Sequence, residues 1–162
     1  MTDMMEAILE EEDTLKGRFL TFSLEGESYG IEIKYVTEII KIQAITQMPE
    51  LPEYMKGIIN MRGKIIPVMD IRLRFKKKPE DYSDRTCIIV IDISGLHVGL
   101  IVDHVAEVLT IDGENIVDPP QITQAGNRYI KSIGRVGNDV KLILNCEKLL
   151  TEEEVSTISH AL

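Results

Sequence analysis

The stretch Met61-Arg62-Gly63-Lys64 is where the sequence comes nearest to a phosphate site, because two basic side chains flank a glycine. A phosphate-binding loop needs a Gly-x-x-x-x-Gly-Lys-Ser/Thr pattern that leads into a helix. Here Lys64 is followed by Ile65-Ile66-Pro67-Val68, which is typical of a strand. Gly63 is better explained as the residue with positive φ in a tight turn. We therefore expect a β-hairpin tip and no phosphate site.

Other reactive side chains are scattered along the chain. His97, His104 and His160 do not pair with Cys, Asp or Glu at the spacing of metal ligands. Cys87 and Cys146 each lie in an apolar, strand-like segment, which favours reduced, buried thiols over a disulfide. The sequence has no serine in a nucleophile-elbow setting. We expect no catalytic residue, no metal ligand and no cofactor.

The composition is that of a globular, acidic protein. Apolar residues make up 44% of the 162 residues, charged residues make up 28%, and the net charge is −9. The negative charge disfavours nucleic acid as a partner, since phosphate binders carry basic surfaces, and the Lys76–Lys78 run is short. No apolar run approaches the ~20 residues that span a bilayer, and residues 1–6 lack the pattern of a signal peptide. We expect a cytoplasmic protein without membrane insertion.

The chain contains an internal repeat. Residues 18–42 align without a gap on residues 87–111, so that glycines and apolar positions coincide. Residues 54–71 align in the same way on residues 129–146, with six extra residues in the connecting loop. This self-similarity predicts a duplicated structural unit.

Each half is predicted to contain about five short strands. Leu20, Phe22 and Leu24 alternate as they would along one face of a strand. One helical turn is expected in each half, near Tyr35–Ile40 and near His104–Leu109. Small all-β units of this kind usually close into barrels, which removes free sheet edges. One half would bury a marginal core, so we expect the two halves to pack together in an all-β protein.

The ends and the middle of the chain differ from the repeats. The predicted organisation is an acidic tail at 1–16, a domain at 17–150 with repeats at about 17–75 and 86–150, a polar linker at about 76–85, and a C-terminal helix at 151–162. Thr151 and Glu154 form a capping box at the start of that helix. Val155 and Ile158 are predicted to face inward.

Several polar residues of the first repeat have structural explanations. Pro67 cannot donate to a ladder, so its strand should be an edge or bulged at that point, and Asp70 can accept backbone donors at the strand end. Arg62 at the hairpin tip could pair with Glu38 in the same half. The alternative is an unpaired arginine that only aids solubility. An exposed pair would add about 0–1 kcal/mol to stability, and its value would be orientation at a docking surface.

Three stretches of the sequence resemble the CheW family of chemotaxis coupling proteins. They read YGIEIKYVTEIIKI, MPELPEYMKGIINMRGKIIPVMDIRLRF and GLHVGLIVDHVAEVLTI. The resemblance covers about residues 17–150. Its most specific part is the spacing of Gly57, Asn60, Arg62, Gly63, Pro67 and Asp70.

The resemblance implies a fold and a function. The fold is a pair of tandem SH3-like, five-stranded barrels that exchange their N-terminal strands. The function is that of a non-enzymatic adaptor, which joins transmembrane chemoreceptors to the histidine kinase CheA in receptor arrays of the bacterial cytoplasm. The implied partners are the cytoplasmic tip of the receptors and the regulatory domain of the kinase.

An adaptor of this kind needs two contact surfaces. For the receptor we expect a groove between the barrels, near the helical turns, with a polar rim; its residues are Ile33, Val36, Glu38, Ile39, Arg62, Val102 and Val105. For the kinase we expect the second half, through Ile130, Ile133, Val136 and Val140. Each of these aliphatic residues could instead be ordinary core. For Ile33 and Val102 the core is the favoured interpretation.

Two other functions remain open at this point. The chain could be a stand-alone β-barrel that binds a ligand or peptide, or an unrecognised enzyme. It could also be the coupling protein of a chemosensory system other than flagellar chemotaxis. Binding to receptor fragments and to CheA would separate the adaptor from the first alternative.

Overall fold

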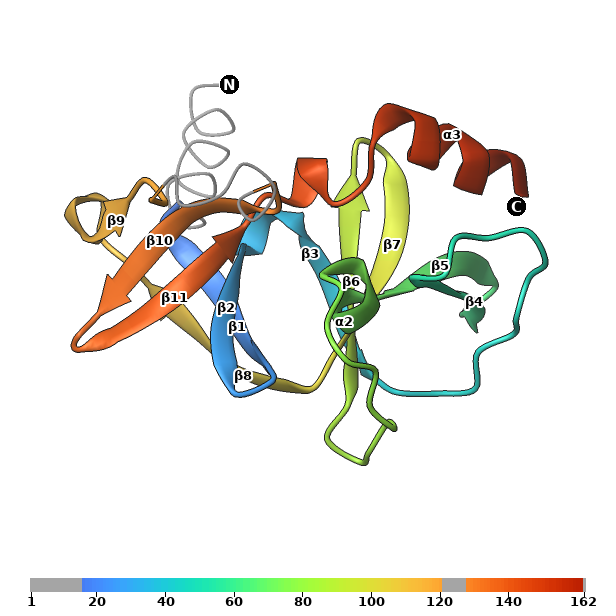
Figure 1. The fold of residues 1–162 in the computed structure, drawn as a ribbon, viewed down its shortest axis with the longest axis horizontal. Helices are drawn as coiled ribbons and strands as arrows, with labels where there is room; N and C mark the ends of the chain where they lie inside the picture. The colour runs from blue at the N-terminus through green and yellow to red at the C-terminus, as the bar shows by residue number, and fades with distance from the viewer. Residues whose placement is uncertain (1–15, 121–127, 162) are drawn as a thin grey trace, which may run out of the picture.

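The computed structural model describes residues 16–120 and 128–161, which form two curved sheets that lie side by side (Figure 1). The six-stranded sheet has the order β8 (His104–Thr110), β1 (Arg18–Leu24), β2 (Glu27–Glu32), β11 (Asp139–Leu144), β10 (Ile130–Val136) and β9 (Ile116–Val117). The five-stranded sheet has the order β3 (Val36–Lys41), β6 (Cys87–Ile93), β7 (Leu96–Val102), β5 (Lys64–Asp70) and β4 (Met55–Met61). The helical segments are η1 (Ile33–Tyr35), α2 (Ile71–Arg74), η2 (Gly113–Asn115), η3 (Cys146–Lys148) and α3 (Glu152–Ala161).

The first hairpin of each repeat belongs to the sheet built mainly from the other repeat. The β1–β2 hairpin lies between β8 and β11, and the β6–β7 hairpin lies between β3 and β5. The junctions are two short parallel ladders, β2 with β11 and β5 with β7. The predicted all-β architecture with exchanged N-terminal strands is therefore confirmed.

The largest hydrophobic core joins the two sheets. Phe22 and Ile31 from the six-stranded sheet and Ile91 and Leu100 from the five-stranded sheet are all fully buried in this central cluster. Each sheet also has a smaller cluster of its own. Because most of the buried apolar surface lies between the sheets, the two halves stabilise each other, as the small size of each half predicts.

The predicted helical turns at Tyr35–Ile40 and His104–Leu109 are wrong. In the first half, helical geometry is limited to the 3₁₀ turn η1, and β3 begins at Val36. In the second half, β8 begins at His104. Burial alternates along β3, which pairs with β6. Its β-branched side chains fit this half-buried strand better than a helix.

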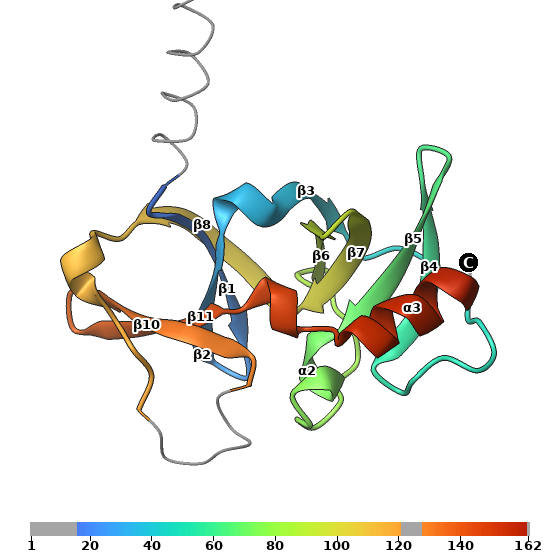
Figure 2. The ribbon, with the colours of Figure 1, turned by 90° about the horizontal axis from the view of Figure 1, so that it is seen from above.

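The C-terminal helix has the predicted capping box. The Thr151 Oγ1 atom accepts a hydrogen bond from the Glu154 amide at 3.1 Å, and Glu154 Oε1 accepts one from the Thr151 amide at 2.9 Å. Ile158 is buried in the central cluster, and Val155 packs against it half-buried. Figure 2 shows α3 lying along the five-stranded sheet. The predicted acidic tail covers residues 1–16, of which residues 1–15 lie outside the described part of the chain.

Of the two structural roles predicted at the end of the first repeat, that of Asp70 is observed. The edge or bulge predicted at Pro67 is wrong, because β5 is an inner strand between β7 and β4 and its pairing at Pro67 is regular. Asp70 accepts the amides of Arg72 and Leu73 at 2.9 Å and 3.4 Å, and so caps α2. Pro67 pairs with Ile58 of β4, whereas the ladder between β5 and β7 begins one residue later. Pro67 therefore lies where β5 has a ladder partner on one side, so its missing N–H leaves no gap.

Candidate protein-docking surface

The tip between β4 and β5 is a tight two-residue turn. Arg62 and Gly63 both have positive φ, 52° and 86°, as a type I′ hairpin turn requires. The Asn60 Oδ1 atom accepts the Gly63 amide at 2.9 Å and fixes the turn from within. This geometry confirms the predicted hairpin tip and aims the Arg62 side chain outward.

Arg62 forms an ion pair with Glu38 of β3, as hypothesised from the sequence. The Arg62 Nη2 atom contacts the Glu38 Oε1 atom, and the two side chains are 71% and 32% exposed. Because solvent screens an exposed pair, it adds little to stability. The pair instead holds a guanidinium and a carboxylate in fixed positions on the surface, where they can orient a partner.

Exposed aliphatic side chains accompany this pair. Ile39 follows Glu38 on β3, and Ile65 lies at the start of β5, just after the tip; both are exposed. Their counterparts in the second repeat, Val108 and Val140, are also exposed. The sequence analysis named Ile39 and Val140 but missed Ile65 and Val108, although the repeat alignment makes them equivalent to those two. Each repeat thus exposes an aliphatic side chain at the same two positions, where a partner can reach it.

The remaining residues that were predicted to contact the receptor differ in how deeply they are buried. Val102 is 1% exposed in the central cluster, so it supports the surface from beneath and is not available to a partner. The prediction that Val102 lines the groove is therefore wrong, and its interpretation as a core residue is confirmed. Ile33, Val36 and Val105 are half-buried and pack against the same cluster. The space between the sheets is thus largely filled by core.

The four residues that were predicted to contact the kinase also differ in how deeply they are buried. Ile130 packs against the central cluster, and Val136 packs against the small cluster of the six-stranded sheet. Ile133 is half-buried on β10. Val140, near the tip of the β10–β11 hairpin, is 53% exposed and is the one of the four most accessible to a partner.

A buried arginine that the sequence analysis missed joins the linker to the second repeat. The Arg72 side chain, 7% exposed, donates through Nε to Asp103 at 2.7 Å and also pairs with that carboxylate through Nη2. It further contacts Glu80 and the Lys78 carbonyl of the linker. Burial would raise the pKa of Asp103, but hydrogen bonds from Arg72 and the Glu25 amide outweigh it and hold the pKa below its ordinary value. This network ties the linker to the β1–β2 turn.

A second buried arginine fastens α3. The Arg74 guanidinium lies over the rings of Tyr54 and Tyr129, 4.1 Å and 5.1 Å from their centroids. It donates to the Leu149 carbonyl at 2.8 Å and to Glu154 at 2.7 Å. Cation–π contacts and a charge-assisted hydrogen bond thus join α2, α3 and the start of β10.

Reactive chemistry is not assembled on the described part of the chain. Within residues 16–120 and 128–161, His, Cys, Asp and Glu form no cluster of three that could hold a metal ion. Both cysteines are free thiols, and burial raises the pKa of Cys146 to about 12, which keeps it protonated. None of the helices in these ranges has the length and apolar character needed to cross a membrane.

Known proteins resemble this chain over most of its length. The CheW-like domain model matches residues 18–154. Chemotaxis protein CheW of Klebsiella aerogenes is 32% identical over 91% of this chain and 90% of its own length, and CheW of Treponema pallidum is 31% identical over 88% and 87%. The crystal structure of the scaffolding protein TtCheW from Thermoanaerobacter tengcongensis superimposes with a TM-score of 0.79 at 38% identity, covering 85% of this chain and 94% of that one. The chain therefore belongs to the CheW-like domain family, whose members are chemotaxis scaffold proteins and not enzymes.

Proposed function

We propose that the protein couples the cytoplasmic tips of transmembrane chemoreceptors to the regulatory domain of the histidine kinase CheA, in the cytoplasm at receptor arrays. The support is its similarity to chemotaxis proteins CheW along most of their length. The structural observation that carries the receptor contact is the Arg62–Glu38 pair on the edge strand β3, which also carries the exposed Ile39.

The two partners would use different sheets. A receptor helix would place its apolar side on Ile39 and the accessible part of Val36, while Glu38 and Arg62 at the rim fix its register. Ile33 and Val105 would support this surface from the edge of the central core. The kinase would contact the six-stranded sheet through Val140 and Ile133, with Ile130 and Val136 behind them. One molecule could then hold both partners at once.

A second candidate is a coupling protein of another chemosensory system. Protein FrzA of Myxococcus xanthus, a relative with a name other than CheW, is 26% identical over 82% of this chain. The surfaces described above would serve such a system equally well, since they do not depend on which receptor is bound.

Reversing the charge at the hairpin tip tests the proposal. Arg62→Glu places two carboxylates together and removes the donor that orients the receptor helix, so we expect binding to a receptor cytoplasmic fragment to weaken about tenfold or more. Stability should change by less than about 1 kcal/mol, because the pair is exposed. Binding is measured by co-sedimentation with receptor fragments and with CheA, and receptor-stimulated CheA autophosphorylation gives the coupled readout.

Two further variants test whether the loss of receptor binding is specific to the charge of Arg62. Arg85→Glu reverses an exposed arginine on the linker and should leave receptor binding unchanged. The double variant Arg62→Glu with Glu38→Arg restores an ion pair of opposite polarity, so it should recover stability but not receptor affinity. If the wild-type protein binds neither receptor fragments nor CheA, the adaptor proposal fails. If it binds both but Arg62→Glu binds as tightly as the wild type, this surface is not the receptor site.

A further inference from the structure

The parallel ladder between β2 and β11 is shorter than either strand. It consists of two register pairs, Leu142 with Tyr29 and Ile143 with Gly30. Continuing the same register toward the start of both strands would pair Lys141 with Ser28 and Val140 with Glu27, but the strands are not paired there. Figure 1 shows that the tips of the β1–β2 and β10–β11 hairpins point in different directions, so the two strands diverge.

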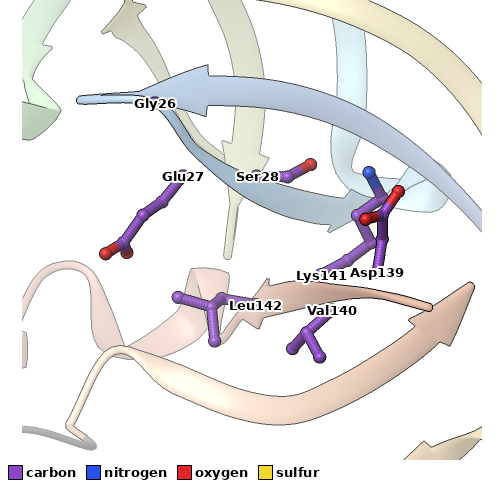
Figure 3. Close-up of a pocket in the computed structure, with 7 residues that line it drawn as sticks. All are labelled: Gly26, Glu27, Ser28, Asp139, Val140, Lys141 and Leu142. Carbon is purple, nitrogen blue, oxygen red and sulfur yellow. The ribbon is translucent and has the colours of Figure 1, made fainter.

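The hollow between the diverging strands coincides with the missing part of the ladder. We call it the strand wedge; its lining residues are Gly26, Glu27, Ser28, Asp139, Val140, Lys141 and Leu142 (Figure 3). On its outer side β2 pairs with β1 down to Glu27, and β11 pairs with β10 up to Asp139. One edge of each strand thus pairs with its hairpin partner. Across the wedge, the facing edges at residues 27–28 and 139–141 have no ladder partner, and the ladder begins where Leu142 pairs with Tyr29.

The side chains around the wedge form two rows. Val140 and Leu142 lie on the same side as Glu27, whereas Asp139 and Lys141 lie on the side of Ser28 (Figure 3). This alternation continues the pleat of a sheet. A segment lying between the strands would thus meet aliphatic groups with every second side chain and polar groups with the others.

The equivalent place in the five-stranded sheet has a different lining. There the repeat puts Pro67 where the wedge has Leu142, and Ile66, which is buried, where the wedge has Lys141. Pro67 has no N–H and the ladder between β5 and β7 begins at Val68, whereas Leu142 pairs with Tyr29. Ile66 and Pro67 of β5 are thus both buried, whereas Val140 and Lys141 of the wedge remain accessible to a partner.

We propose that the strand wedge is a binding site for a short extended segment of a partner protein, which adds to the edges of β2 and β11. Unpaired main-chain donors and acceptors favour an extended peptide over a compact ligand, as in other cases of strand addition. The lining carries two carboxylates and one ammonium group, Glu27, Asp139 and Lys141, and so favours a segment that is not acidic. The inference rests on the ladder register; it shares Val140 with the kinase contact proposed above, and the pentapeptide titration tests the wedge without the kinase.

A titration with a designed peptide tests this site. The probe is an acetylated, amidated pentapeptide of sequence Lys-Val-Thr-Val-Lys, added up to millimolar concentration to the ¹⁵N-labelled full chain. We expect saturable amide shifts centred on residues 26–28 and 139–142. A peptide of the same sequence that is N-methylated at alternate residues has lost half of its main-chain donors, and we expect it to bind at least about tenfold more weakly if strand pairing supplies the affinity.

Two variants related by the repeat serve as probe and control. Val140→Lys removes the exposed aliphatic contact and adds positive charge, so it should weaken binding of the pentapeptide at least about fivefold. Ile65→Lys makes the same change at the equivalent exposed position of the other sheet and should leave binding unchanged. Equal binding of the N-methylated peptide, shifts centred elsewhere, or no saturable shifts each overturn the proposal.

Discussion

Asp103→Asn is expected to lower the free energy of unfolding by about 1–3 kcal/mol, because it removes a charged hydrogen-bond partner of a buried arginine. The reason is that Arg72, 7% exposed, keeps its charge after the carboxylate is gone. Its remaining partners are the Lys78 carbonyl at 3.2 Å and the largely exposed Glu80. The change is measured by urea unfolding of both proteins.

A neutral control and a pH series separate this cause from a general loss of packing. Glu80→Gln removes the exposed partner of Arg72 and should cost less than about 1 kcal/mol. The pKa of Asp103 is lowered in the folded protein, so its stabilisation is complete above the pKa of an unfolded aspartate, about 3.9, and disappears as the pH falls through the folded value. In acid the difference between wild type and Asp103→Asn should therefore shrink. An unchanged difference would exclude the ion pair as the cause.

Gly57→Ala should also destabilise the protein strongly, by about 3–5 kcal/mol. Gly57 has a φ of 144°, and a Cβ atom there would lie 2.1 Å from the Thr46 carbonyl oxygen. That oxygen cannot retreat freely, because it accepts the Ile58 amide at 2.9 Å, and the Thr46 amide in turn donates to Ile58. The substitution would separate the segment around Thr46 from the outer edge of β4. Thermal and urea unfolding measure the loss.

Gly63→Ala is the matched control for this prediction. Gly63 also has a positive φ, 86°, but no atom lies within 4 Å of its hypothetical Cβ. Its cost should be limited to backbone strain, about 1–2 kcal/mol. If the two substitutions cost the same, contact with Thr46 does not explain the role of Gly57.

The sequence predicted the features that repeat and missed those that depend on distant segments. The alignment of residues 18–42 with 87–111 revealed the duplication, and its turn glycines marked the hairpins. The exchange of hairpins came from the resemblance to a family, because a parallel ladder of two or three residues leaves no periodic pattern. The helical turns were misplaced because η1 is only three residues long, and β-branched residues then continue as strand.

Some features of the candidate surface could be predicted from the sequence, and others could not. Glu38 and Arg62 could be paired from the sequence because both belong to one half and one of them stands at a hairpin tip. The burial of Val102 could not be separated from a surface position by alternation alone. Arg72 and Asp103 are 31 residues apart and come from different repeats, so their contact cannot be predicted from a local sequence pattern.

The exchange of hairpins also sets the order in which the protein can form while it is being synthesised. The first strands to leave the ribosome, β1 and β2, have no neighbours in their sheet until β8 and β11 follow. The five-stranded sheet, in contrast, has all of its strands once residue 102 has emerged. The nascent N-terminal hairpin therefore has no strand partner on either edge until β8 and β11 emerge, after all strands of the five-stranded sheet. A chain cut within the linker would leave two fragments, each of which lacks the hairpin held by the other.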